Sequence, residues 1–134
     1  MRNELIWLSV LLIGTALCAE SAAAHHAFAA EFDAAQPIKL EGTIAKVEWI
    51  NPHSWIHLDV KGADGALVLW MIEGGPPNAL FRRGFTDESL PVGTAIIIEG
   101  FRARDGSARA NGRNIIFADG SSPFVGSFSI ESTR

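Results

Sequence analysis

The alternation of apolar and polar side chains predicts strands rather than helices along most of this chain. The clearest example is residues 54–60, where aliphatic side chains alternate with Trp55, His57 and Asp59. An alternation of period two places the aliphatic side chains on one face and the other three on the opposite face. Because the aliphatic face belongs in a core, this segment is predicted to be a half-buried strand.

The same pattern and the intervening turn residues predict the remaining elements. Runs rich in strand-forming residues predict four further strands, at residues 40–50, 67–73, 94–104 and 107–118. The first of these is expected to contain a β-bulge and to stop at Asn51-Pro52. Gly-Asp combinations at residues 62–65 and 105–106 are typical of hairpin turns. The segment 78–84 predicts a short helix, with Asn near its start and Gly just past its end.

Five strands in about 80 residues, with a short helix between the third and the fourth, predict an all-β fold. The element order is that of a small OB-like Greek-key barrel, and a small β-sandwich is the alternative. This domain is expected to cover residues 39–119. Residues 25–38 have weak periodicity and are predicted to form an N-terminal arm, and residues 120–134 are predicted to be a flexible C-terminal tail.

The first 24 residues have the features of a signal peptide. Arg2 precedes an apolar run over residues 5–17, and the small residues 22–24 suit a cleavage site. The apolar run is shorter than the roughly 20 residues that a membrane-spanning helix needs. We therefore expect cleavage before His25 and a mature protein that is periplasmic or secreted, with no stable membrane insertion.

Cleavage changes what the composition allows. The mature chain would keep 110 residues, 10 basic and 13 acidic, with a net charge of −3, and it would lose Cys18. Without cysteine it has no disulfide, no thiolate nucleophile and no zinc ribbon. Its mild acidity argues against binding to a nucleic-acid backbone. All four histidines remain in it.

The histidines fall in two clusters, His25-His26 and His53 with His57. Neutral imidazole is a preferred ligand of Cu(II), Zn and Ni, so the clusters predict a metal site. A terminal histidine also offers its α-amine, and this arrangement resembles the histidine brace of secreted copper proteins. The expected donors are His25, His26 and His57, with His53 next, and copper is the expected metal, with zinc or nickel as alternatives.

His53 and His57 are not expected to form a metal site by themselves. In an extended strand, α-carbons four residues apart lie about 13 Å apart. A bend at Asn51-Pro52 would be needed to shorten that separation. Asp59 shares a face with His57 in the predicted strand, so it is the expected carboxylate partner that orients the His57 imidazole.

An alternative hypothesis is a ligand-binding platform formed by two tryptophans and a methionine. Trp55, Trp70 and Met71 would provide a platform for a small molecule or a glycan, or would simply belong to the core and rim of the barrel. The mature chain has one methionine, which argues against a soft Cu(I) site. An enzymatic role has little support, because a chain of this size leaves little room for an enclosed substrate pocket.

Several motifs together resemble an uncharacterised family of small exported proteins of Gram-negative bacteria, a domain of unknown function. They are the start His25-His26-x-Phe28, the block Asn51-Pro52-His53, and Trp70 and Glu73. The resemblance covers nearly the whole mature chain and implies export and a compact β domain. It implies no activity and no cofactor.

The function expected from the sequence is therefore metal binding, of the chaperone or resistance type. A metal ion is the expected partner, with another periplasmic protein as a second candidate and nucleic acid excluded.

Overall fold

A computed structural model of the chain describes residues 28–124 and 126–129. The chain divides into two compact units, Met1–Ala30 and Glu31–Arg134. The predicted signal peptide and the cluster His25-His26 lie outside the described residues. Within the described part of the chain, no helix is both long and apolar enough to cross a membrane.

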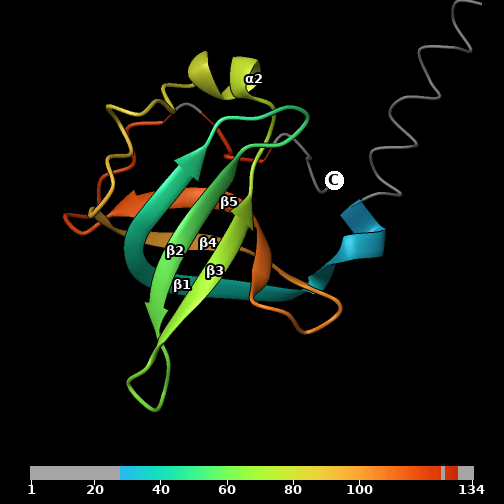
Figure 1. Ribbon diagram of the computed structural model, residues 1–134. Helices are drawn as coiled ribbons and strands as arrows, with labels where there is room; N and C mark the ends of the chain where they lie inside the picture. The colour runs from blue at the N-terminus through green and yellow to red at the C-terminus, as the bar shows by residue number, and fades with distance from the viewer. Residues whose placement is uncertain (1–27, 125, 130–134) are drawn as a thin grey trace, which may run out of the picture. The chain divides into compact units, whose positions relative to one another are not determined.

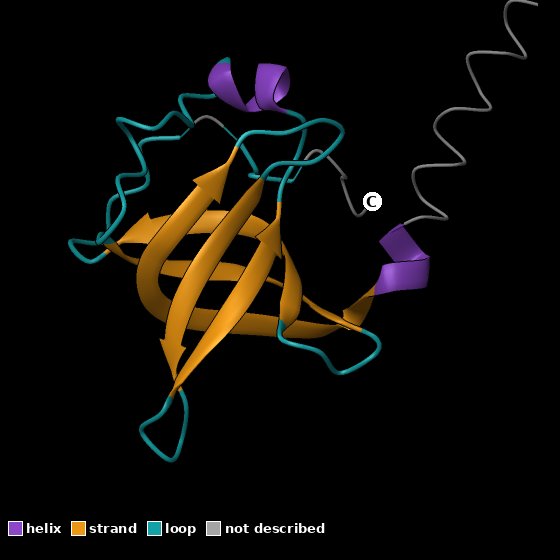
Figure 2. Ribbon diagram, viewed as in Figure 1, coloured by secondary structure: helices purple, strands orange, loops and turns teal. Residues whose placement is uncertain are grey.

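The second unit contains five strands among its described residues: β1 (Phe32–Glu48), β2 (Trp55–Lys61), β3 (Leu67–Glu73), β4 (Ala95–Ala103) and β5 (Arg109–Phe117) (Figure 1). They close into a barrel in the order β1-β2-β3-β5-β4, and Figure 2 shows the strands curving into one ring. Every neighbouring pair is antiparallel except β3 and β5, which are parallel. The predicted small all-β fold with five strands is confirmed, and a single closed sheet replaces the two packed sheets of the alternative.

A short helix, α2 (Pro77–Phe81), connects β3 to β4 and lies at one end of the barrel (Figure 1). Proline suits the first turn of a helix because its missing N–H would have no helical partner there. After the helix the chain turns at Gly84, which has a φ of +90°. Leu80 is fully buried and anchors the helix to the core. The predicted helix at this place is confirmed, starting one residue earlier than expected. Residues 28–31 form a second helical turn that the sequence analysis did not predict.

The core fills the interior of the ring with aliphatic side chains from every strand. In β2 the two inward positions Ile56 and Leu58 are fully buried, as the alternation predicted. The bulge predicted in β1 is also present, because the pairing with β2 shifts between Ile44 and Lys46. The other buried members of the core are Leu40, Ile72, Leu80, Phe85, Leu90, Ile96, Ile98, Ala110, Ile115 and Phe128.

Strand β1 begins at Phe32, eight positions before the predicted start, so part of the expected arm is strand. Phe32 pairs with Ala103 of β4, and pairing with β4 resumes only at Pro37. The four residues between them bulge away from β4. This irregularity interrupts the alternation, which is why the pattern failed to reveal the first part of the strand.

The C-terminal segment is not loose throughout, in contrast to the prediction. Phe128 is fully buried, and its N–H donates to the carbonyl oxygen of Arg113 at 2.8 Å. Its own carbonyl oxygen accepts from the N–H of Gly75 at 2.9 Å. Phe124 and Phe128 stand among serine and glycine residues without a periodic pattern, so the sequence carried no signal for this docking.

Candidate functional site

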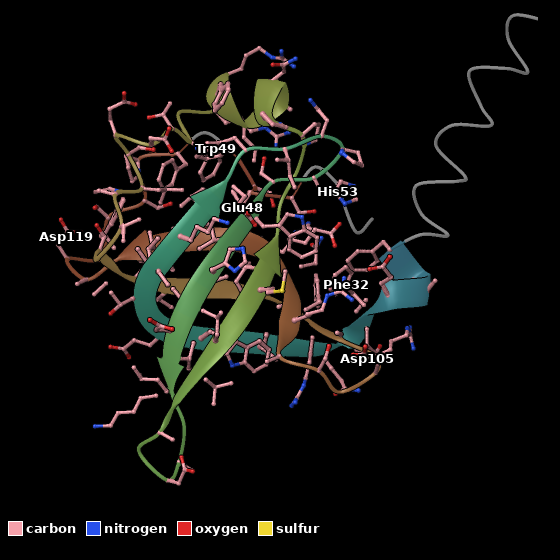
Figure 3. All side chains as sticks on the ribbon, viewed as in Figure 1. Phe32, Glu48, Trp49, His53, Asp105 and Asp119 are labelled. Atoms are coloured by element: carbon pink, nitrogen blue, oxygen red, sulfur yellow. The ribbon has the colours of Figure 1, made fainter. Side chains whose placement is uncertain are left out.

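The candidate site lies where β1 turns into β2, at the end of the barrel that carries α2 (Figure 3). Two backbone hydrogen bonds hold this turn against the end of β3. The N–H of Ser54 donates to the carbonyl oxygen of Gly75 at 3.0 Å, and the N–H of Gly74 donates to that of Ser54 at 2.8 Å. These bonds bring His53 beside Glu73, the last residue of β3.

Nδ1 of His53 lies within hydrogen-bond distance of Oε1 of Glu73. The carboxylate is almost fully buried, whereas 46% of the His53 side chain is exposed. An ionised carboxylate can only accept hydrogen bonds, so Nδ1 carries the proton that faces it. In the neutral imidazole the lone pair then belongs to Nε2. The contact with Glu73 therefore holds the His53 ring in one orientation and makes Nε2 the acceptor nitrogen of the neutral ring.

His57 makes a similar contact with a different carboxylate. Its Nε2 lies 2.7 Å from Oε2 of Glu48, and only 15% of the His57 side chain is exposed. The other oxygen of Glu48 accepts a hydrogen bond from Nζ of Lys46. The hydrogen bond from Lys46, followed by that from His57, holds the pKa of the Glu48 carboxyl below its ordinary value. Glu48 is thus ionised and bridges two basic side chains on the outer face.

We expect a carbon-13 NMR titration of Glu48 to show a midpoint below the ordinary glutamate value of 4.5. Because the pKa is lowered in the folded state, the stability that this group contributes is present above pH 4.5 and is lost as the pH falls through the folded pKa. Lys46→Gln should raise the midpoint toward 4.5, since it removes the largest cause of the shift. Lys39→Gln removes the same charge from a side chain that pairs with Glu99 instead, and should leave the midpoint unchanged. A midpoint that does not respond to Lys46→Gln would contradict this account.

The two histidines do not share a partner. Within residues 28–124 and 126–129, no three side chains of His, Cys, Asp or Glu come together in a way that could hold a metal ion. His53 and His57 thus provide two separate imidazoles, each beside its own carboxylate. A complete metal site would need donors from outside this part of the chain.

Asp59 is not the carboxylate that contacts His57, contrary to the expectation. In the sheet, Asp59 lies opposite Thr43 and Leu69, whereas Glu48 reaches His57 from β1. In the register of β1 and β2, Lys46 is paired with His57. Glu48 is paired with Trp55, two positions before His57, so Glu48 is a diagonal neighbour of His57. Diagonal neighbours across an antiparallel pair are within reach of long side chains. Pairing the first two predicted strands would have brought Glu48 beside His57 only if the β-bulge in the first strand had been placed at the right residue.

The residues of the alternative platform do not share a face. Met71 is paired with His57 on the outer face, whereas Trp70 is paired with the buried Leu58 on the inner face. Trp55 faces outward, and the guanidinium of Arg109 lies 5.6 Å from the centre of its ring. Trp70 packs against the core. The three side chains therefore provide no continuous aromatic surface.

Three polar side chains near the end of β3 are buried, which the sequence pattern did not predict. Ser54, Glu73 and Asn111 are each at most 6% exposed. Glu73 is paired with Asn111 across the parallel contact of β3 and β5. Within the described residues, the Oγ of Ser54 and the Oδ1 of Asn111 are buried without a hydrogen-bond partner. Burying a polar side chain without a hydrogen bond costs free energy. Apolar packing therefore does not explain why polar side chains occupy these buried positions at this end of the barrel.

A family match covers most of the chain. Residues 14–113 match a family described as "Family of unknown function (DUF6152)". No similar protein was found among the curated proteins or among the solved structures.

Proposed function

The chain belongs to the family of unknown function DUF6152, and we propose that it is an exported, non-enzymatic protein that binds copper. In this proposal His53 supplies one imidazole ligand through Nε2. The amine and the imidazoles of a mature chain that begins at His25-His26 supply the others. Zinc and nickel are the alternative metals, because they share the preference for imidazole.

The contact between His53 and Glu73 is the observation that carries this proposal. Histidines that bind metals commonly donate their second ring N–H to a carboxylate, which fixes the tautomer and the ring orientation. His53 has such a carboxylate at Nδ1, and 46% of its side chain is exposed. His57 has a carboxylate as well, but its side chain is much less exposed. The geometry therefore favours His53 over His57 as the ligand, reversing the order expected from the sequence.

Export and the histidine terminus rest on the sequence alone. An apolar segment followed by small residues favours cleavage before His25. The α-amine of a terminal residue has an ordinary pKa near 8, so it becomes available to a metal when the metal displaces its proton. A terminal His25 thus offers an amine and an imidazole in one chelate ring.

We expect the exported protein to bind Cu(II) at micromolar concentrations and to lose affinity in His53→Ala. The experiment starts with mass spectrometry of the exported chain, which establishes its first residue, and continues with a calorimetric titration of Cu(II). Glu73→Gln should weaken binding about 10- to 100-fold, because it removes the group that orients His53. Glu41→Gln removes an exposed carboxylate of β1 and serves as the matched control. His57→Ala should weaken binding less than His53→Ala.

A pH series gives the same titration a second readout. Imidazole must be deprotonated to bind a metal, so affinity should fall as the pH drops through about 6.5. An affinity that stays constant between pH 7 and pH 5 would contradict histidine ligation. A first residue far from His25, no copper uptake, or an unchanged affinity in His53→Ala would each overturn the proposal.

A further inference from the structure

A second site is suggested by a hollow on the outer surface of β1, β4 and β5, whose lining includes neither His53 nor Glu73. We propose that this hollow binds a small organic anion with a flat apolar body. Its volume is about 540 Å³. Pockets for small molecules commonly measure about 300–1,000 Å³ and combine apolar walls with a few polar groups. None of the residues that line the hollow belongs to the proposed metal site.

The irregular pairing of β1 and β4 creates one wall of the hollow. The pairing of β1 with β4 is interrupted between Phe32 and Pro37, so four residues of β1 have no partner in the register with β4. Pro37 and Ile38 line the hollow immediately after this interruption. A second irregularity, between Glu99 and Gly100, lies on the opposite side, where β4 pairs with β5. The hollow is thus built into the backbone of the sheet.

The C-terminal segment forms another wall and is held by side-chain hydrogen bonds. The Oγ of Ser127 donates to the carbonyl oxygen of Arg113 at 3.0 Å. Nη1 of Arg83 donates to the carbonyl oxygen of Ser127 at 2.6 Å. The buried Phe128 follows directly and anchors the segment in the core. The wall at Ser127 is therefore fixed before any ligand arrives, which lowers the entropic cost of binding.

The lining of the hollow is more cationic than anionic. Lys39 and Arg113 contribute two positive charges and Glu99 contributes one negative charge. The Glu99 carboxylate already faces Nζ of Lys39 at 3.4 Å and accepts from Nδ2 of Asn114 at 3.2 Å. The net charge of the lining is therefore positive, which favours an anion.

Phe101 and Arg113 indicate which chemical groups the ligand should carry. The guanidinium of Arg113 lies over the Phe101 ring, 5.8 Å from its centre, so a cation and an aromatic ring pack against each other in the lining. A guanidinium suits a carboxylate or a sulfonate through paired hydrogen bonds. The Phe101 ring and the neighbouring Pro37 and Ile38 suit a flat apolar group. The ligand class that fits both is an aromatic or alicyclic acid.

The test compares 2-naphthoate with 2-naphthalenemethanol, which share the ring system and differ in charge. Each is titrated into nitrogen-15-labelled full-length protein and followed by NMR. We expect saturable binding of 2-naphthoate, with shifted amide signals at Phe101, Arg113 and Asn114. Arg113→Gln should weaken that binding by about tenfold or more, because it removes a charged hydrogen-bond donor. Lys39→Gln should weaken it less, and added salt should weaken it as well.

Arg82→Gln is the matched control, because Arg82 is an exposed arginine at the end of α2 and does not line the hollow. It should bind 2-naphthoate as the unchanged protein does. The proposal is overturned if the neutral alcohol binds equally well, if the shifted signals lie elsewhere, or if Arg113→Gln and Lys39→Gln both bind like the control. Retained dispersion of the NMR spectrum shows that each variant is folded. Copper binding is not involved in any of these readouts, so failure here leaves the metal proposal unaffected.

Discussion

Replacing Phe128 by alanine is expected to lower the free energy of unfolding by about 3–5 kcal/mol, the usual cost of removing a buried aromatic ring. Phe128 is fully buried and packs edge-to-face against Phe85, with ring centres 5.3 Å apart. Its ring also fills the space above Gly74 and Gly112, where an added Cβ would come within 2.4 and 3.1 Å of ring atoms. Because a whole domain is stabilised by about 5–15 kcal/mol, the loss is a large share of the total.

Urea denaturation followed by tryptophan fluorescence measures this loss. Phe81→Ala makes the same chemical change at a side chain that is 46% exposed and contacts Trp49 alone among the described aromatic rings. That control should lose about 1 kcal/mol, the worth of one aromatic pair. If Phe128→Ala lost no more than Phe81→Ala, the C-terminal segment would not belong to the core.

Gly100→Ala is expected to cost about 3 kcal/mol, at the upper end of the penalty for overpacking. An added Cβ would lie 2.0 Å from the carbonyl oxygen of Asn111 and 3.0 Å from its carbonyl carbon. Both are backbone atoms of the paired strand β5, so no side-chain rotation relieves the contact. β4 and β5 would have to separate at Gly100, next to the irregularity at Glu99.

Gly93→Ala is the control that separates the steric contact at Gly100 from the cost of backbone strain alone. Gly93 has a φ of +89°, and an added Cβ there would meet no atom within 4 Å. The expected cost is about 1–2 kcal/mol, that of a left-handed conformation alone. In thermal unfolding, the melting temperature of Gly100→Ala should therefore be lower than that of Gly93→Ala. Equal melting temperatures would mean that the sheet adapts to the methyl group at Gly100.

The local parts of the fold were predictable because strand alternation and turn chemistry involve neighbouring residues only. The strand of residues 67–73 was predicted with the bounds that the structure has. The turns at Asp64-Gly65 and Asp105-Gly106 were also predicted, since glycine accommodates the positive φ found at Gly65 and Gly106. The start of β1 was missed because its irregular pairing with β4 removes the alternation that marks a strand.

The candidate site was predictable only as a set of residue types. The sequence showed clustered histidines and several carboxylates, and it identified His53 and His57 as residues of interest. The partner of each histidine depends on which strands are neighbours and on their register. A bulge near Ile44 changes which β1 side chains lie beside His57, and it brings Glu48 within reach of the His57 ring.

The sequence by itself determined the number of strands, the turns between β2 and β3 and between β4 and β5, and the place of the helix. These properties arise from side chains a few residues apart, whose periodicity and backbone preferences act before any tertiary contact forms. Only the tertiary structure decided that Glu73 contacts His53, that Phe128 returns to the core and that a hollow forms on the outer surface of β1, β4 and β5. Each of these depends on groups far apart in the chain, brought together by pairing and burial that no local pattern encodes.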